Sequence, residues 1–172
     1  EEVFLLKDVQ KENPIGVFDS GVGGLTVLRE IIDALPKESV IYFGDTARCP
    51  YGPRDLKEVK KFVLEIVDFL SHQGVKMVVI ACNTGTAAGL VSAQKKFKNL
   101  PIIGVIKPGA QAAFEATKNK KVGVIGTVGT ISSSSYHKAL LEFDASIEVF
   151  ARATPEFVEF VERGEVEGEE IE

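Results

Sequence analysis

The sequence predicts an α/β protein in which parallel sheets carry helices on both faces. Short apolar segments rich in β-branched residues alternate with longer segments of helical periodicity along the 172 residues. Strands that are buried on both faces have continuous apolar runs of this kind, whereas half-exposed strands alternate apolar and polar residues. Strands that alternate with helices form right-handed crossovers on a parallel sheet.

The elements follow one another with short connections. The clearest helix spans residues 56–70, where apolar side chains share one face and charged side chains take the other. Gly74 comes next, and glycine is typical just beyond a helix C-terminus. The expected strands are residues 15–18, 40–43, 75–81, 102–106, 122–125 and 147–150. The segment Phe-Lys-Asn-Leu-Pro at residues 97–101 predicts a junction, which gives an N-terminal arm (1–13), a first α/β lobe (14–99) and part of a second (100–172).

Composition excludes several classes of function. The formal net charge is -5, whereas a nucleic acid or an anionic membrane would call for a basic face. The apolar runs are too short to span a bilayer, and the first residues lack the basic-then-apolar order of a secretory signal. The two cysteines, Cys49 and Cys82, have neither metal-site nor disulfide-framework spacing. We therefore expect a cytoplasmic protein without a metal, a membrane or a nucleic-acid partner.

Cys82 is the most informative residue, because it lies between a buried strand and a helix start. Ligands bind at the carboxyl ends of strands in open α/β sheets. The free N–H groups of the following helix stabilise a thiolate, which predicts a lowered pKa for Cys82. The alternative is a structural residue, since free cysteines are among the most buried side chains.

A second loop follows the first expected strand and contains Asp19 and a glycine-rich turn at residues 21–24. Backbone N–H groups in such a turn can hold an anion. The dinucleotide-binding pattern fails, because Thr26 stands where its third glycine is needed. Asp19 is either a helix cap or a residue that acts on a substrate.

A third loop, residues 44–54, contains two prolines and Gly52, and its Tyr51 offers a flat wall with a polar tip. A rigid loop over the sheet can shape a pocket. The alternative is a surface connection in which Asp45 and Arg54 are ordinary solvated charges, and for Cys49 itself this alternative is preferred. A parallel sheet would bring these loops to one edge, and with them Asp19, Ser20, Tyr51, Gly52, Cys82, Asn83 and Thr84.

Five blocks of sequence carry a specific resemblance: FDSGVGGLTVLRE, FGDTARCPYGPR, ACNTGTAA, IGVIKPGA and GVIGTVGTISSSSY. In this order they resemble the glutamate racemases of the cofactor-independent aspartate/glutamate racemase superfamily. The resemblance implies two pseudo-symmetric α/β lobes with glutamate between them. It implies interconversion of L- and D-glutamate, which supplies D-glutamate for peptidoglycan, without pyridoxal phosphate or metal. Family members often form homodimers.

The resemblance also assigns roles to residues. Cys82 matches one of two cysteines that exchange the α-proton from opposite faces, and Asp19 matches the acid that assists it. Glu159 matches an acid associated with the second cysteine. The positions that match substrate-holding residues are Ser20, Tyr51, Gly52, Asn83, Thr84, Thr130 and, less closely, Thr127.

The second cysteine of the family lies in a Gly-Cys-Thr-His block that this sequence lacks, and Cys49 belongs to the same lobe as Cys82. Residues 163–172 resemble a turn and the opening of another helix, which suggests a fragment, with a frayed charged tail as the alternative. As given, the chain is therefore expected not to racemise glutamate. Two alternatives stay open: an aspartate racemase, since one methylene contributes only about 1–3 kcal/mol to discrimination, and a non-catalytic amino-acid-binding fragment.

Overall fold

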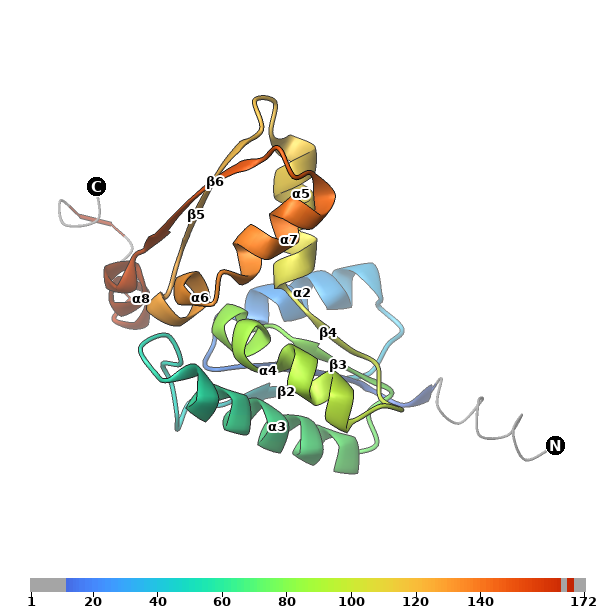
Figure 1. Cartoon of the computed structure of the whole chain (residues 1–172). Coiled ribbons are helices and arrows are strands. Elements are labelled where there is room, and N and C mark those ends of the chain that lie inside the picture. Colours follow the sequence, from blue (N-terminus) through green and yellow to red (C-terminus); the bar gives the residue numbers. More distant parts are fainter. Residues whose placement is uncertain (1–11, 165–166, 169–172) are drawn as a thin grey trace.

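The computed structural model describes residues 12–164 and 167–168, so most of the expected N-terminal arm lies outside the described residues. Its strands form two sheets, and every strand pair is parallel. Figure 1 shows the two sheets and their helices as two adjoining lobes. The first sheet has the order β2-β1-β3-β4, with β1 (Ile15–Asp19), β2 (Val40–Gly44), β3 (Met77–Ile80) and β4 (Ile102–Gly104). The second sheet pairs β5 (Lys121–Gly126) with β6 (Glu148–Ala153).

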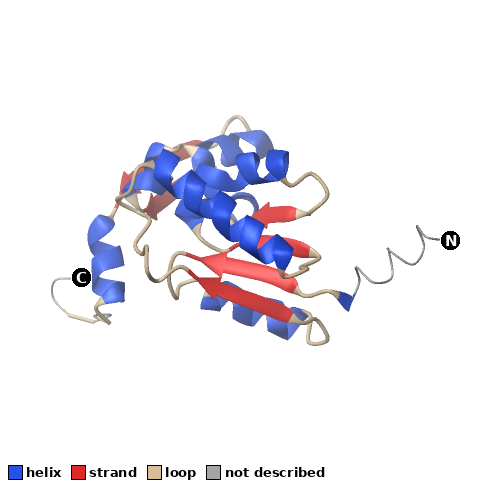
Figure 2. Ribbon diagram, turned by 90° about the horizontal axis from the view of Figure 1, so that it is seen from below, coloured by secondary structure: helices blue, strands red, loops and turns tan. Residues whose placement is uncertain are grey.

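Helices cover both faces of the first sheet (Figure 2). Ile15, Val17 and Val79 pack toward α2, while Phe18 and Ile80 pack toward α3 and α4. This alternation within continuous apolar strands confirms the predicted fold class. The helices are α2 (Leu25–Ala34), α3 (Leu56–His72), α4 (Asn83–Lys96), α5 (Ile106–Ala116), α6 (Val128–Ser132), α7 (Ser135–Phe143) and α8 (Pro155–Glu162).

The predicted boundaries agree with the structure to within a few residues, with one informative difference. The helix predicted over 56–70 runs to His72 and stops before Gly74. The strand predicted over 102–106 ends at Gly104, because α5 begins at Ile106. β4 follows the predicted junction at 97–101 and yet pairs with β3, so the first sheet continues to Gly104.

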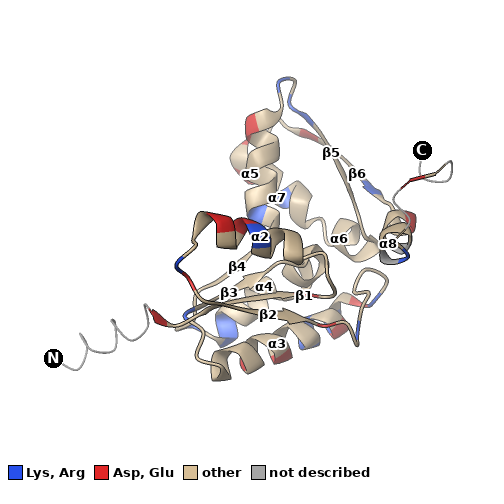
Figure 3. Ribbon diagram, turned by 180° about the vertical axis from the view of Figure 1, so that it is seen from behind, with Lys and Arg blue, Asp and Glu red and all other residues tan. Residues whose placement is uncertain are grey.

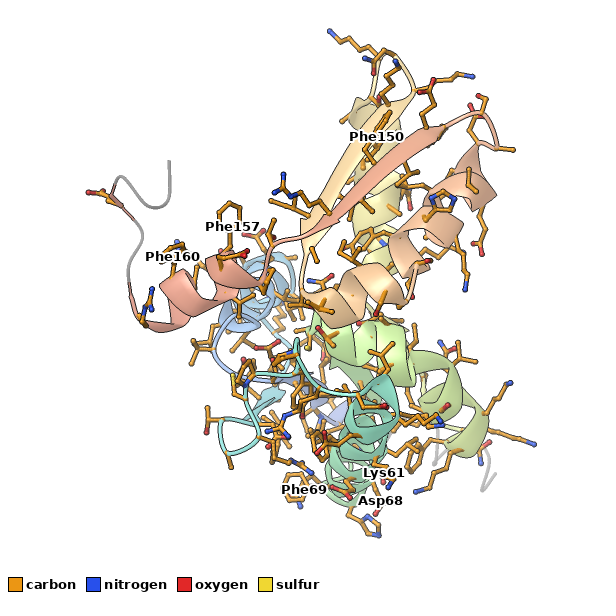
Figure 4. All side chains as sticks on the ribbon, turned by 60° about the vertical axis from the view of Figure 1, so that its left-hand side comes forward. Lys61, Asp68, Phe69, Phe150, Phe157 and Phe160 are labelled. Atoms are coloured by element: carbon orange, nitrogen blue, oxygen red, sulfur yellow. The ribbon has the colours of Figure 1, made fainter. Side chains whose placement is uncertain are left out.

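The second sheet has its core on one face. Val122 and Ile147 are buried there against Ala110 and Leu140 from α5 and α7. Residues that point the other way are exposed: Ile125 is 63% and Phe150 59% accessible. Figure 4 shows Phe150 on β6, with Phe157 on α8. This face of the second sheet therefore leaves two large apolar side chains open to solvent.

Charged side chains lie on the outside of the helices. Figure 3 shows acidic and basic residues interspersed along α3, whose apolar residues Val59, Val63 and Ile66 are buried. No helix within residues 12–164 combines the length and the apolar character that crossing a membrane requires.

Candidate active site

Cys82 lies directly after β3 and is the N-cap residue of α4, with extended backbone angles. Its Sγ accepts a hydrogen bond from the N–H of Gly85 over 3.3 Å, and its thiol lies 3.6 Å from Oγ of Ser20. The residue is 7% exposed. A thiol is thus held at the carboxyl end of the sheet by the first turn of a helix.

The pKa of the Cys82 thiol is raised, so the predicted lowering was wrong. Burial is the largest cause, and the negative charge of Asp19 adds to it. Hydrogen bonding with Gly85 and Ser20 acts in the opposite direction but is outweighed. Desolvation disfavours the thiolate more than one helix N-terminus favours it. The neutral thiol is therefore the resting form at neutral pH.

Asp19 holds the glycine turn rather than capping a helix. Its Oδ2 accepts a hydrogen bond from the N–H of Gly21 over 2.9 Å, and the residue is 7% exposed. The N-cap position of α2 is Gly24, and no side chain caps it. The helix-cap alternative for Asp19 was therefore wrong.

Tyr42 is a site neighbour that sequence reasoning missed. Its hydroxyl donates to the carbonyl of Gly21 over 3.1 Å, from the adjacent strand β2. Burial raises the pKa of Tyr42 to about 12, with further contributions from the negative charge of Asp19 and from Cys82 in its ionised form. The signal in the sequence that could have identified Tyr42 was a tyrosine inside an otherwise apolar predicted strand.

The loop at residues 45–54 is anchored by a buried acid. The Tyr51 hydroxyl donates to Oδ2 of Asp45, and these residues are 1% and 5% exposed. The alternative in which Asp45 is a solvated charge was therefore wrong. Arg54, half-buried, pairs with Glu58 over 3.2 Å. Burial, followed by the hydrogen bond to Asp45, raises the pKa of Tyr51, so its phenol stays protonated.

Gly52 joins this loop to the second lobe. Its carbonyl accepts a hydrogen bond from the N–H of Gly129 over 3.0 Å. A Cβ placed on Gly52 would lie 2.8 Å from Cβ of Thr127, which is closer than side chains approach. A larger residue at position 52 would therefore require the loop or Thr127 to move.

Three predicted hydroxyl residues meet where α4 and α6 come together. Thr84 Oγ1 lies 2.9 Å from that of Thr127 and 3.2 Å from that of Thr130. Thr127 and Thr130 are 3.0 Å apart. Next to them, Oδ1 of Asn83 accepts from the Tyr136 hydroxyl over 2.8 Å. The hydroxyl cluster Thr84–Thr127–Thr130 therefore contains residues that are more than forty positions apart in the chain.

A cavity of about 580 Å³ opens beside the hydroxyl cluster. Asn83, Thr127 and Thr130 line it, together with apolar residues of β5, α7 and α8. Cys82, Asp19 and Ser20 form a separate group that does not line this cavity. Helix α8 contains Glu159, whose side chain lies outside what the structure describes.

The predicted residues thus form two adjacent groups, linked through the consecutive residues Cys82, Asn83 and Thr84. One holds a thiol beside a carboxylate, which suits proton transfer. The other presents hydroxyl and amide groups, which can donate hydrogen bonds to a carboxylate. Among residues 12–164, no three His, Cys, Asp or Glu side chains come together as a metal site requires.

Comparison with known proteins places this geometry in a family. Residues 15–170 match the family model described as Asp/Glu/Hydantoin racemase. A glutamate racemase of Listeria monocytogenes is 56% identical over 151 residues, which are 88% of this chain and 56% of that protein.

The chain is also similar to solved structures. The glutamate racemase isoform RacE1 of Bacillus anthracis has a TM-score of 0.85 at 55% identity, over 88% of this chain and 57% of that one. The glutamate racemase of Francisella tularensis, solved with D-glutamate, has a TM-score of 0.87 at 39% identity, over 93% and 60%. The chain thus spans less than two thirds of the length of these relatives. With its parallel sheets, its strand-end thiol and this match over most of its residues, the chain belongs to the Asp/Glu/hydantoin racemase family.

Proposed function

We propose that this chain supplies one half of the active site of an enzyme that interconverts L- and D-glutamate. The observation that carries the proposal is Cys82, held beside Asp19 and Ser20 at the carboxyl end of β3. In the cell the enzyme would work in the cytoplasm and supply D-glutamate for peptidoglycan. Homodimer formation stays a prediction, which sedimentation velocity would test.

Cys82 is proposed to exchange the α-proton on one face of the amino acid. Proton removal beside a carboxylate is difficult, so a base close to the α-carbon and donors for the developing charge are both needed. Because the resting thiol is neutral, Asp19 is proposed to take its proton as the substrate binds. The positive α-ammonium group would favour the thiolate that results. The reaction needs no cofactor in this scheme.

The substrate is proposed to be held by both lobes. Asn83, Thr84, Thr127 and Thr130 would receive a carboxylate, because their donors converge beside the cavity. Ser20 would bind the substrate next to the thiol of Cys82. Since the phenol of Tyr51 is bonded to Asp45, we propose that Tyr51 and Gly52 contribute backbone groups.

The second base is proposed to come from outside these 172 residues. Cys49 is the other cysteine of the sequence, and it belongs to the loop of the first lobe. Glu159 is proposed to accompany the second base, following the family resemblance. Support for a longer protein comes from the 56–60% coverage of the relatives and from the exposed side chains of Ile125 and Phe150 on the open face of the second sheet.

We further propose that the chain comprises a first lobe and part of a second. Because β4 pairs with β3, the division is better set after Gly104 than at the residue 99 expected from sequence. Helix α5 then opens the second lobe, whose core it shares with α7.

Measurements of ligand binding and of racemisation test the proposed function. The 172-residue chain is titrated with L-glutamate, D-glutamate and L-aspartate by calorimetry, and inversion is followed by optical rotation. We expect binding of glutamate in preference to aspartate, without racemisation. In a protein of the relatives' length, Cys82→Ser should keep glutamate binding and lose racemisation. Tighter binding of aspartate, or full turnover by the Cys82→Ser variant, would refute the assignment.

A further inference from the structure

Asp45 links two segments of the site but has no direct part in the proposed proton transfer. It follows β2 and has its side chain buried at 5% exposure. Its backbone N–H donates to the carbonyl of Asp19 over 2.9 Å, at the end of the neighbouring strand. Its Oδ2 accepts from the Tyr51 hydroxyl and from Nε of Arg48, the latter over 2.6 Å. One residue thus connects the strand end that carries Asp19 to the loop that carries Tyr51.

The charge of Asp45 is compensated by an anchored arginine. Arg48 Nη1 pairs with Glu65 of α3 over 2.6 Å. The guanidinium lies 4.2 Å from the ring centroid of Phe62, and that ring packs 5.6 Å from the ring of Tyr51. A buried carboxylate persists only when it is paired and hydrogen-bonded, and both conditions hold here. The loop is thereby fastened to α3 as well as to β1.

Tyr51 transmits this anchoring to the contact between the lobes. The next residue, Gly52, accepts the hydrogen bond from Gly129 and lies against Thr127 without room for a side chain. Thr127 belongs to the hydroxyl cluster with Thr84 and Thr130. A shift of the loop would therefore alter the spacing of groups proposed to hold the substrate carboxylate.

We propose that Asp45 is a positioning residue for glutamate binding, because its carboxylate fixes Tyr51 and so sets Gly52 against Thr127 and Gly129. The inference rests on the proposed function and deepens it. Asp45 acts through the loop, and the substrate meets Gly52, Thr127 and their neighbours. The competing role is purely structural: the same contacts would stabilise the fold without affecting the site.

The test uses the 172-residue chain with Asp45→Ala, Asp45→Asn and Tyr51→Phe. Asp33→Asn is the control, since Asp33 lies on α2 with its side chain 68% exposed. Calorimetry gives the dissociation constant of D-glutamate, and amide NMR shifts report Gly52 and Gly129. All measurements are made well below the unfolding midpoint of each variant, so that the folded fractions match.

We expect Asp45→Ala to weaken D-glutamate binding about tenfold, the effect expected when displacement of the loop costs the bound carboxylate one hydrogen bond. The amides of Gly52 and Gly129 should shift with it. Asp45→Asn, which keeps an acceptor for Tyr51, should recover part of both effects, and Tyr51→Phe should add little to Asp45→Ala. Asp33→Asn should match the wild type.

A lower unfolding midpoint with unchanged affinity and unchanged Gly52 and Gly129 amides would overturn the proposal. If Asp45→Ala does not fold, Tyr51→Phe removes the same hydrogen bond with less disruption, and the same readouts decide. If the wild-type chain binds no glutamate, the same variants are compared in a protein of the relatives' length, where absence of glutamate binding would refute the proposed function. The amide shifts then still decide whether Asp45 positions Gly52.

Discussion

The Tyr136 hydroxyl of α7 donates a hydrogen bond to Oδ1 of Asn83, the first residue of α4, over 2.8 Å. Asn83 directly follows Cys82, so this bond links the second lobe to the residue beside the proposed base. With its oxygen held by Tyr136, the amide directs its NH2 group elsewhere, and that group is a donor only. Tyr136 thus leaves the NH2 group of Asn83 as the part of the amide that can donate a hydrogen bond to a substrate.

Removal of the Tyr136 hydroxyl should lower the stability of the chain measurably. We expect Tyr136→Phe to lower the free energy of unfolding by about 1 kcal/mol, because one hydrogen bond is lost while the ring still packs. Urea denaturation of the 172-residue chain measures it. In an Asn83→Ala background the same substitution should cost much less, since the acceptor is gone. Equal losses in both backgrounds would show that Tyr136 acts through other contacts.

The reactivity of Cys82 should report its raised pKa. Thiolates are the nucleophiles in alkylation, so burial and the charge of Asp19 should make Cys82 react slowly with iodoacetamide near neutral pH. The rate should rise with pH to a midpoint above that of an ordinary thiol. Asp19→Asn removes the negative charge, lowers the pKa of Cys82 and should speed the reaction at pH 8.

Peptide mapping by mass spectrometry separates Cys82 from Cys49 in the same sample. Cys49, which is more exposed, provides an internal control because its rate should be the same in both proteins. Asparagine retains an oxygen for the Gly21 N–H, so the glycine turn should survive the change. An unchanged or slower Cys82 reaction in Asp19→Asn would contradict the electrostatic account.

Local patterns were enough to predict most of the fold. Continuous β-branched runs set the strands, and the periodicity up to His72 followed by Gly74 set α3. The division between the lobes stays a prediction. Proline and polar residues at 97–101 resemble a linker, whereas the pairing of β4 with β3, which favours a later division, depends on residues distant in sequence.

The site was less predictable, because its properties depend on tertiary contacts. The pKa of Cys82 follows from desolvation by packed neighbours, which a helix-end argument does not include. In the sequence, Asp45 resembles any acidic residue of a loop. Only the folded chain shows that Tyr51 and Arg48 donate hydrogen bonds to its carboxylate. The resemblance named Thr84, Thr127 and Thr130 separately, but only the folded chain brings their hydroxyls together.

The contact between the lobes should be sensitive to a single methyl group. In Gly52→Ala the new Cβ would lie 2.8 Å from Thr127, so the loop or Thr127 must move. We expect a loss of about 1–3 kcal/mol of unfolding free energy, typical of overpacking. Gly123→Ala is the matched control, because its Cβ would meet no atom within 4 Å. Chemical denaturation should give a change within about 0.5 kcal/mol for that variant; similar losses in both would point to glycine replacement in general.

The open face of the second sheet, with its two exposed apolar side chains, allows a test of whether the chain is part of a longer protein. Ile125 and Phe150 are 63% and 59% exposed, so Ile125→Ser and Phe150→Ser should change the stability of the 172-residue chain by less than about 0.5 kcal/mol. If further chain covers this face, each substitution should cost about 1–3 kcal/mol in a protein of the relatives' length, where these side chains would be buried.

Leu140→Ala serves as the control for that comparison, because Leu140 is fully buried between α7 and its neighbours. It should cost about 2–5 kcal/mol in both proteins, as cavity-forming substitutions do. Equally small effects of Ile125→Ser and Phe150→Ser in the short and the long protein would mean that this face stays open to solvent. The second lobe would then be complete without cover on its outer face, and the apolar surface would need another explanation.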